Sequence, residues 1–175
     1  MTNLHNRLMQ PTSAPDDISA VVDERARVRS IMTAKVVSCR PTDTLHAAAQ
    51  IMWDQDCGAV PVVDAEGRLC GIITDRDVCM AAYTQGAHIA AISVGDVMSG
   101  PAHTCRPEDT LNRVAALMAE AQVRRLPVVD AQDHPIGIVS MADIVRNVRI
   151  LGEREAESVA FQLLRAVSRQ RDARD

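Results

Sequence analysis

Aromatic side chains are almost absent from this sequence of 175 residues, which has one Trp, one Tyr and one Phe. Any hydrophobic core must therefore be built from aliphatic side chains, Met and Ala. The same scarcity argues against an RNA-binding surface of stacked aromatic platforms. The formal net charge is -4 at pH 7, and an acidic chain has no overall attraction for a phosphate backbone. Nucleic acid is therefore not expected as a partner.

Long apolar runs are also missing. No stretch of the sequence approaches the roughly 20 apolar residues that a membrane-spanning helix needs. Residues 1–17 have no apolar run after their few basic residues, as a secretory signal would. We expect a cytoplasmic protein that has no membrane partner.

Signatures of metal sites, disulfides and enzymes are lacking too. The number of cysteines is five, which is odd, and no Cys-x-x-Cys pair or spaced histidine pair accompanies them, so neither a disulfide framework nor a zinc site is expected. No Walker loop or dinucleotide glycine motif occurs, and no Ser-His-Asp or Cys-His pattern stands out. We expect no catalytic residue, no metal and no required cofactor.

The chain does contain a plain internal repeat with an offset of 66 positions and no gap. When residues 30–80 are aligned on 96–146, 17 of the 51 positions are identical. A unit of this size buries a marginal core alone, so we expect the two copies to pack against each other. The matched strings are 39–45 (CRPTDTL) with 105–111 (CRPEDTL), 61–65 (PVVDA) with 127–131 (PVVDA), and 71–74 (GIIT) with 137–140 (GIVS).

Each copy reads as β-α-β-β-α, which predicts an α+β fold. Helical spacing of apolar residues follows a capping Asp or Thr, and Gly58 is expected to end the first helix. β-prone runs separated by a polar turn predict a hairpin. The predicted elements are strands at 36–38, 59–63, 69–73, 102–104, 125–129 and 136–139, and helices at 43–57, 74–83, 109–121 and 140–148.

The chain outside these elements divides into termini and a connection. Residues 151–175 are expected to form a further helix and a tail, and the helix should bury one apolar face on the module or on a partner subunit. The predicted face comprises Ala156, Val159, Ala160, Leu163, Leu164 and Val167. The predicted organisation is 1–17 disordered, 18–84 first unit with a leading helix at 18–31, 85–95 linker, 96–150 second unit, and 151–175 C-terminal helix and tail.

The repeated string Gly-apolar-apolar-(Thr/Ser)-x-x-Asp after a hairpin resembles the CBS domain family. Residues 126–130 (LPVVD) and the openings 30–33 (SIMT) and 96–99 (DVMS) resemble it as well. The resemblance covers about residues 28–149 and is strongest to short stand-alone bacterial CBS-pair proteins, or Bateman modules. It implies a pseudo-two-fold pair with two clefts between the units, and a disk-shaped homodimer of two such pairs.

Two hydroxyl–carboxylate pairs are candidate ligand contacts. Thr74 and Ser140 each stand at the predicted start of a helix, where backbone N–H groups favour a phosphate. Asp77 and Asp143 follow three residues later, and an ionised carboxylate can accept from both hydroxyls of a ribose. The competing interpretation is a capping box that merely closes the helix end. Both roles are compatible for the two hydroxyl residues.

Further candidates would contact the base and the phosphates. Arg76, Arg124 and Arg125 are candidate phosphate contacts, because the guanidinium group binds phosphate through two parallel hydrogen bonds. Residues 58 and 59, which match Arg124 and Arg125 in the first copy, are Gly and Ala, so the two clefts should differ. The apolar candidates for the base are Val37, Val60, Pro61, Leu126 and Pro127.

The resemblance implies a non-enzymatic regulatory module that senses an adenosine-type nucleotide and signals to an unknown target protein. AMP, ADP and ATP are the expected ligands, with S-adenosylmethionine and NAD behind them because they share the adenosine group. One alternative is a structural dimerisation or protein-interaction module with empty clefts. A third hypothesis is a thiol or metal sensor that uses the equivalent residues Cys39 and Cys105.

Overall fold

The computed structural model describes residues 26–151 and 153–168. The predicted disorder of 1–17, most of the predicted leading helix and the tail from 169 onward therefore lie outside the described residues. Where that leading helix was expected to continue, at 26–31, the chain forms a single 3-10 turn, Val28–Ser30. Within the described part, no helix is long and apolar enough to cross a membrane.

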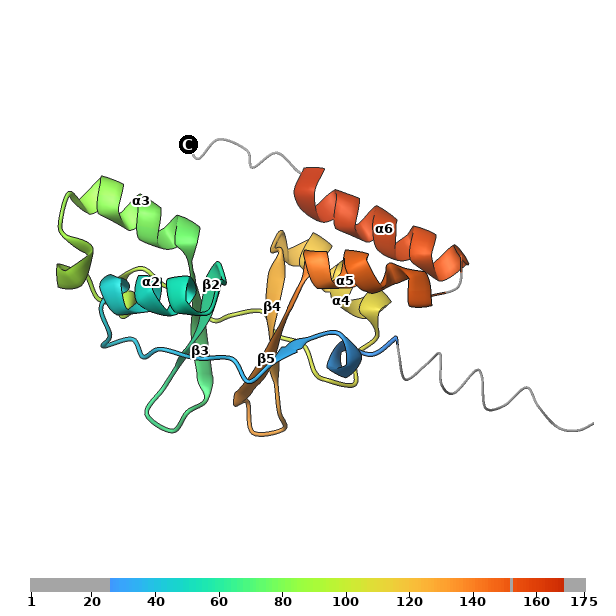
Figure 1. The fold of residues 1–175 in the computed structure, drawn as a ribbon, viewed down its shortest axis with the longest axis horizontal. Coiled ribbons are helices and arrows are strands. Elements are labelled where there is room, and N and C mark those ends of the chain that lie inside the picture. Colours follow the sequence, from blue (N-terminus) through green and yellow to red (C-terminus); the bar gives the residue numbers. More distant parts are fainter. Residues whose placement is uncertain (1–25, 152, 169–175) are drawn as a thin grey trace, which may run out of the picture.

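The first copy follows the predicted order from its first helix onward (Figure 1). The hairpin prediction is confirmed, because β2 and β3 pair antiparallel with Ala59 opposite Thr74. Thr44 caps the first helix by accepting a hydrogen bond from the Ala47 N–H. The elements are β1 (Thr33–Ala34), α2 (Leu45–Asp54), β2 (Ala59–Val63), β3 (Leu69–Thr74) and α3 (Asp75–Gln85), with 3-10 turns at Ile89–Ala91 and Val94–Asp96.

The second copy repeats this arrangement and adds the predicted C-terminal helix. Its hairpin has the same register, with Arg125 opposite Ser140. The mixed α+β class and the paired units are thus confirmed. The elements are α4 (Leu111–Ala121), β4 (Arg125–Val129), β5 (Pro135–Ser140), α5 (Met141–Asn147), a 3-10 turn at Val148–Ile150, and α6 (Glu153–Ser168).

Two local predictions are wrong. Residues 36–38 and 102–104 form no strand; instead Cys39 and Cys105, which follow them, each make one parallel bridge to the hairpin of their own copy. Gly58 does not end the first helix, because α2 stops at Asp54 and Asp56 takes the left-handed conformation with φ 47°. A short polar side chain tolerates that conformation, which leaves glycine unnecessary there.

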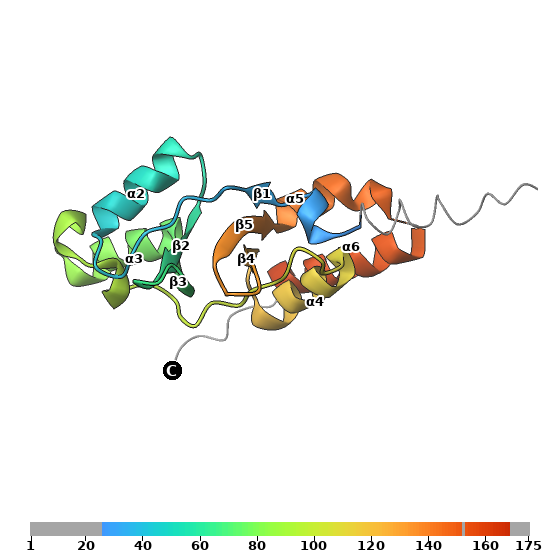
Figure 2. The same cartoon turned by 90° about the horizontal axis from the view of Figure 1, so that it is seen from below.

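The segments that lead into the two copies are exchanged between them. Val28 is fully buried in the core of the second copy, and its repeat partner Val94 is fully buried in the core of the first. Strand β1 accordingly pairs with β5, giving a three-stranded sheet β1-β5-β4 (Figure 2). Residues 85–95 are therefore more than a connection, since Ile92 and Val94 are core residues of the first copy.

A close approach of backbone and Met side chains accompanies this exchange. A Cβ atom on Gly137 would lie 2.8 Å from the Sδ atom of Met32, and one on Gly71 would lie 2.8 Å from the Sδ atom of Met98. Only glycine leaves that space. The glycine of the repeated Gly-apolar-apolar string thus accommodates the exchanged segment of the other copy.

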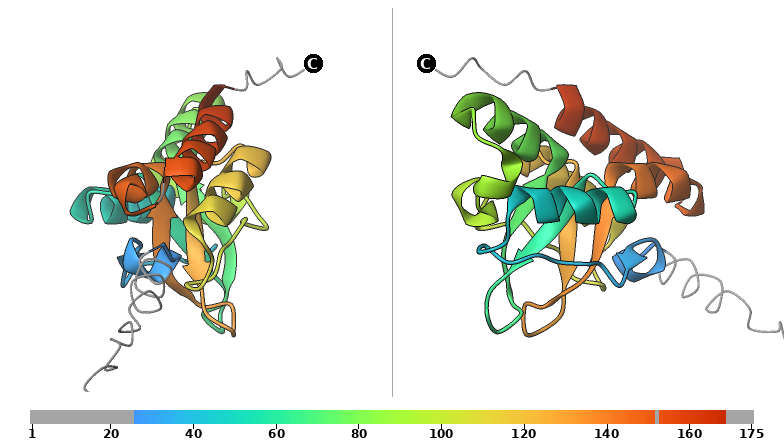
Figure 3. Two further views of the ribbon diagram at one scale, coloured as in Figure 1. Left: turned by 90° about the vertical axis from the view of Figure 1, so that its right-hand side faces the viewer. Right: turned by 60° about the vertical axis from the view of Figure 1, so that its left-hand side comes forward.

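The two hairpin turns also touch. The Leu69 N–H donates to the Asp133 carbonyl over 2.9 Å, and a ring nitrogen of His134 lies 3.3 Å from the Glu66 carbonyl oxygen. Figure 3 shows these two turns side by side. The two copies are therefore joined both by their exchanged segments and by the ends of their hairpins.

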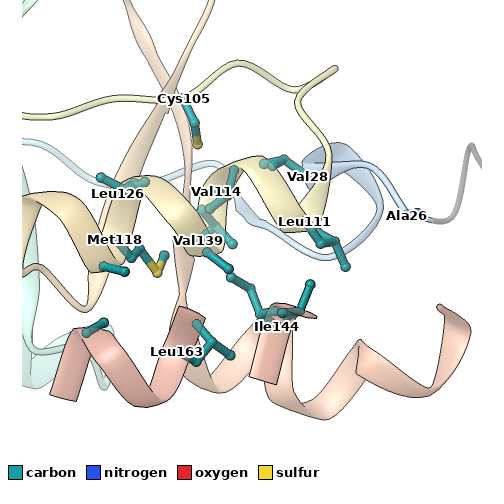
Figure 4. Packing of buried hydrophobic residues seen from close by; sticks show 14 of the residues in the cluster. Ala26, Val28, Cys105, Leu111, Val114, Met118, Leu126, Val139, Ile144 and Leu163 are labelled. Atoms are coloured by element: carbon teal, nitrogen blue, oxygen red, sulfur yellow. The ribbon is translucent and has the colours of Figure 1, made fainter. Parts of the chain in front are cut away.

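Helix α6 packs against α4 on the second copy (Figures 1 and 4). Its buried residues are Val159, Leu163 and Ala166. Ala160, Leu164 and Val167 were predicted on the same face but are exposed. The predicted stripe was too wide, and the true one is shifted toward Ala166, which the sequence pattern did not select.

The exchange predicts where a core mutation acts. Val28→Ala should remove about 2 kcal/mol of stability and should reduce amide hydrogen-exchange protection chiefly in residues 105–145, although Val28 precedes the first copy. The matched variant Val94→Ala should reduce protection chiefly in residues 39–82. Hydrogen-exchange mass spectrometry on both variants measures this, and loss of protection in the same region for both would contradict the exchange.

Candidate functional site

Both predicted hydroxyl–carboxylate pairs form complete capping boxes. The Thr74 hydroxyl donates to Asp77 Oδ2 over 2.6 Å, and the Thr74 N–H donates to the same oxygen over 2.9 Å. Ser140 and Asp143 repeat these two distances. All four residues are partly buried. The capping interpretation therefore holds in both copies, and any ligand contact must come in addition to it.

The backbone N–H groups in the first turn of α3 already have hydrogen-bond acceptors and are not available to a phosphate. The N–H groups of Asp75, Arg76 and Asp77 donate to the Gly58 carbonyl at 3.3 Å, to Asp75 Oδ1 at 2.7 Å and to Thr74 Oγ1 at 3.3 Å, respectively. Free N–H groups are the expectation from the sequence at this helix start. They are satisfied because the carbonyl before β2 and two local side chains already supply acceptors.

The two carboxylates of the capping boxes differ in their remaining oxygen. Arg146 donates to Asp143 Oδ1 over 2.8 Å, whereas the hydrogen bonds from Thr74 to Asp77 use Oδ2 alone. Burial acts to raise the pKa of the Asp143 carboxyl, but hydrogen bonds from Ser140 and Arg146 outweigh it and hold that pKa below its ordinary value. Within the described part of the chain, Asp77 is thus the carboxylate whose second oxygen is available to a hydroxyl ligand.

Arg125 reaches from the second copy to the first. A Cβ atom added to Gly58 would lie 3.1 Å from a terminal nitrogen of the Arg125 guanidinium and 2.7 Å from Asp75 Oδ2. Gly58 thereby leaves space for both groups at the start of α3. Arg76 and Arg124 are both exposed. One place therefore gathers a cation of the second copy with a carboxylate and the capped helix start of the first.

Of the five apolar candidates, four are buried. Val60 and Leu126 are fully buried in the two cores, since strand alternation turns them toward the helices. In this structure their side chains are therefore closed to a base, and their role as contacts for a base stays a prediction. Pro61 and Pro127 are also buried, whereas Val37 is 43% exposed. Val37 is therefore the candidate whose side chain is accessible for an apolar contact with a ligand, whereas Pro61 and Pro127 would first have to become exposed.

Gly58 and Asp75 belong to this place but were missed as site residues. Their repeat partners are Arg124 and Met141. Positions where one copy has changed chemical type are the signal that could have identified them, because cores keep their character while sites diverge.

The two equivalent thiols lie in different cores, with Cys39 in the first copy and Cys105 in the second. Burial raises the pKa of the Cys39 thiol to about 11 and that of Cys105 to about 12. Thiolate is the reactive and metal-binding form. The two residues are therefore neither adjacent nor activated.

The family model for the CBS domain matches the chain twice, at residues 28–83 and 94–150. The chain belongs to the CBS domain family. Hypoxic response protein 1 of Mycobacterium tuberculosis, a relative, is 33% identical over 120 residues, which are 69% of this chain and 83% of that protein. A crystal structure of Hypoxic Response Protein I, with two coordinated zinc ions, has a TM-score of 0.62 to this CBS pair.

Two further solved CBS structures contain adenosine compounds. The CBS domain pair of protein MJ0100, in complex with 5′-methylthioadenosine and S-adenosyl-L-methionine, is 26% identical with a TM-score of 0.63. CBSX2 in complex with AMP is 27% identical with a TM-score of 0.58. Each comparison covers 69% of this chain and 93% of the other. Adenosine ligands are thus found in neighbours of the same fold.

The capping box predicts a pH-dependent contribution to stability. Asp143→Ala should lower the free energy of unfolding by about 1 kcal/mol at neutral pH. Because the folded pKa of this carboxyl is depressed, its contribution is present above the unfolded value of about 3.9 and is lost as pH falls through the folded value. Urea unfolding from pH 7 to pH 3 should show the gap between the two proteins narrowing in acid. A gap that widens in acid would contradict the assignment.

The cysteines should differ in reactivity. Cys79 is exposed while Cys39 and Cys105 are buried, so brief alkylation of the native protein at pH 8 should label Cys79 and spare the other two. In 6 M guanidinium all should react. Peptide mass spectrometry measures the labelling, and a Cys79→Ser variant is the control. Rapid native labelling of Cys39 or Cys105 would revive the thiol-sensor hypothesis.

Proposed function

We propose that this CBS pair is a non-enzymatic regulatory module that binds an adenosine-type nucleotide, AMP, ADP or ATP, between its two copies. The observation that carries the proposal is the reach of Arg125 across to Gly58 and Asp75. A ligand held there would touch both copies at once. The bound nucleotide would bias their arrangement, and a separate cytoplasmic target protein would respond to the change.

Different residues would bind the phosphate and the ribose of the nucleotide. Arg125 would bind a phosphate, with Arg76 and Arg124 as exposed second cations, because a guanidinium group matches phosphate oxygens. Asp77 would accept from the ribose hydroxyls through its spare oxygen, and it is preferred over Asp143, whose oxygens are engaged by Ser140 and Arg146. Adenosine compounds in the structures of MJ0100 and CBSX2 support this choice of ligand class.

The charges around Arg125 suggest an order of affinity among AMP, ADP and ATP. Asp75 is exposed and its carboxylate lies near the Arg125 guanidinium. A carboxylate beside the phosphate-binding cation repels additional phosphates. We therefore expect AMP to bind at least as tightly as ATP. S-adenosylmethionine and NAD remain lower-ranked ligands that share the adenosine group.

Binding would act through a population shift. A ligand can change the arrangement of the copies only if it binds one arrangement better than another. The copies are joined by exchanged segments and by the contact of the hairpin turns, so a change at Arg125 would be transmitted to the helices of both. This mode of action requires no step of chemistry.

Isothermal titration calorimetry with AMP, ADP, ATP, S-adenosylmethionine and NAD tests the proposal. We expect at least one adenosine nucleotide to bind with Kd below about 1 mM and Arg125→Ala to weaken it about tenfold or more, since a charged hydrogen-bonding partner is removed. Asp77→Asn should weaken every ligand that carries a ribose diol. Arg113→Ala, which removes an exposed arginine of α4, is the matched control and should leave Kd unchanged.

The outcome separates the alternatives. Absence of binding by all five compounds would overturn the sensor proposal and leave the interaction module with empty clefts. Binding that Arg125→Ala and Arg113→Ala leave equally intact would place the ligand elsewhere. Zinc titrated into metal-free protein tests the remaining metal hypothesis, to which the zinc-containing structure of Hypoxic Response Protein I draws attention.

A further inference from the structure

An apolar groove lies between α2 and α3 of the first copy. Its wall includes Trp53, whose side chain is 86% exposed, and the exposed Cys79. Exposed aromatic side chains beside an apolar groove are typical of an interaction surface. The residues that define this α2–α3 groove are Ala49, Met52, Trp53, Cys57, Asp75, Val78 and Cys79.

The repeat shows what kind of element fits such a surface. The positions that match the groove in the second copy include Ala115, Met118 and Ile144, and all three are fully buried. They share a core with Leu163 of α6, which packs against α4 (Figure 4). The duplicated surface is thus covered by an amphipathic helix in one copy, and in the other the residues that the structure describes leave it open.

Helix α6 carries a second apolar face beyond the one that packs on α4. We call this the outer face of α6 and define it by Phe161, Leu164 and Val167. These side chains are 61%, 63% and 45% exposed, and their spacing of three residues places them on neighbouring turns of one side of the helix. If its outer face is also buried, α6 lies between α4 on one side and a second surface on the other.

We propose that the outer face of α6 of one molecule docks in the α2–α3 groove of a second copy of the same chain. Among residues 26–151 and 153–168, the outer face of α6 and the α2–α3 groove are both uncovered, and the groove is of the type that a helix fills. Mutual docking of two molecules forms two equal contacts and closes the assembly as a two-fold dimer. Helix α6 then packs on α4 of its own chain and on α2 and α3 of its partner.

The charges at the two surfaces match. Asp75 lines the groove, and Asp54 and Asp56 are exposed at the end of α2 beside Trp53. On α6, the exposed Arg165 is adjacent to Leu164. Opposite charges at the rim of an interface guide association and set its orientation. Trp53 and Phe161 supply the aromatic anchors on which interface affinity commonly depends.

Analytical ultracentrifugation of the full chain tests the docking. We expect the native protein to be a dimer at micromolar concentration, and Trp53→Asp and Leu164→Asp each to weaken dimerisation about tenfold or more. The matched control is Val145→Asp on α5, an equally apolar residue that is 56% exposed and occupies the repeat position of Cys79. It should remain dimeric. Circular dichroism checks that each variant is folded.

Crosslinking gives an independent readout. Leu164→Cys places a thiol on the outer face, and mild oxidation should join it to Cys79 of the second copy, as identified by peptide mass spectrometry. Cys79→Ser in the same background should abolish that crosslink. A monomeric native protein, dissociation by Val145→Asp alone, or a crosslink formed only between two introduced thiols would each overturn the docking.

The docking does not depend on the proposed nucleotide function. Trp53 and Leu164 are outside the set of residues assigned to the ligand, so calorimetry on the same variants reports binding separately. Loss of the dimer with unchanged nucleotide affinity supports the docking as a separate property. Nucleotide binding without any dimer in the native protein overturns the docking and leaves the sensor proposal standing.

Discussion

The exchange of leading segments is the contact on which this structure depends. Val28 completes the core of the second copy and Val94 that of the first, and both are fully buried. Neither copy therefore has a complete core without the segment that leads into the other. A unit of about 55 residues is marginal by itself, and the exchange makes the pair the unit of stability. It also holds the two hairpins so that Arg125 of one copy lies at Gly58 of the other.

The two copies share one framework but differ in the residues beside Gly58 and in the covering of their helices. Ala59 and Asp75 in the first copy correspond to Arg125 and Met141 in the second, so the cation and the carboxylate beside Gly58 come from different copies. The helical surfaces differ as well, since α6 covers that of the second copy and no described element covers that of the first. Asp75 both lines the α2–α3 groove and lies near Arg125, which brings the proposed ligand within reach of the proposed dimer contact.

The sequence predicted the fold well where local chemistry and the repeat agreed. The hairpin strands and the capped helices were found because alternation, turn residues and the Thr-x-x-Asp pattern are local signals. The exchange was not foreseen, because residues 26–34 and 92–99 make their contacts across the chain and no local pattern says which copy they join. The same limit applies to the approach of Arg125 to Gly58, of which the sequence predicts only that the two clefts differ. The burial of Val60 and Leu126 has another cause, because strand alternation alone does not say which side of a hairpin the helices cover.

The proposed function rests on simultaneous contact of a ligand at Arg125 with both copies. Hydrogen-exchange mass spectrometry with and without saturating AMP tests it most directly, because amides at the start of α3 and along β4 belong to different copies. We expect AMP to raise protection in both regions together and Arg125→Ala to remove both effects. Protection confined to one copy, or persisting fully in Arg125→Ala, would contradict it.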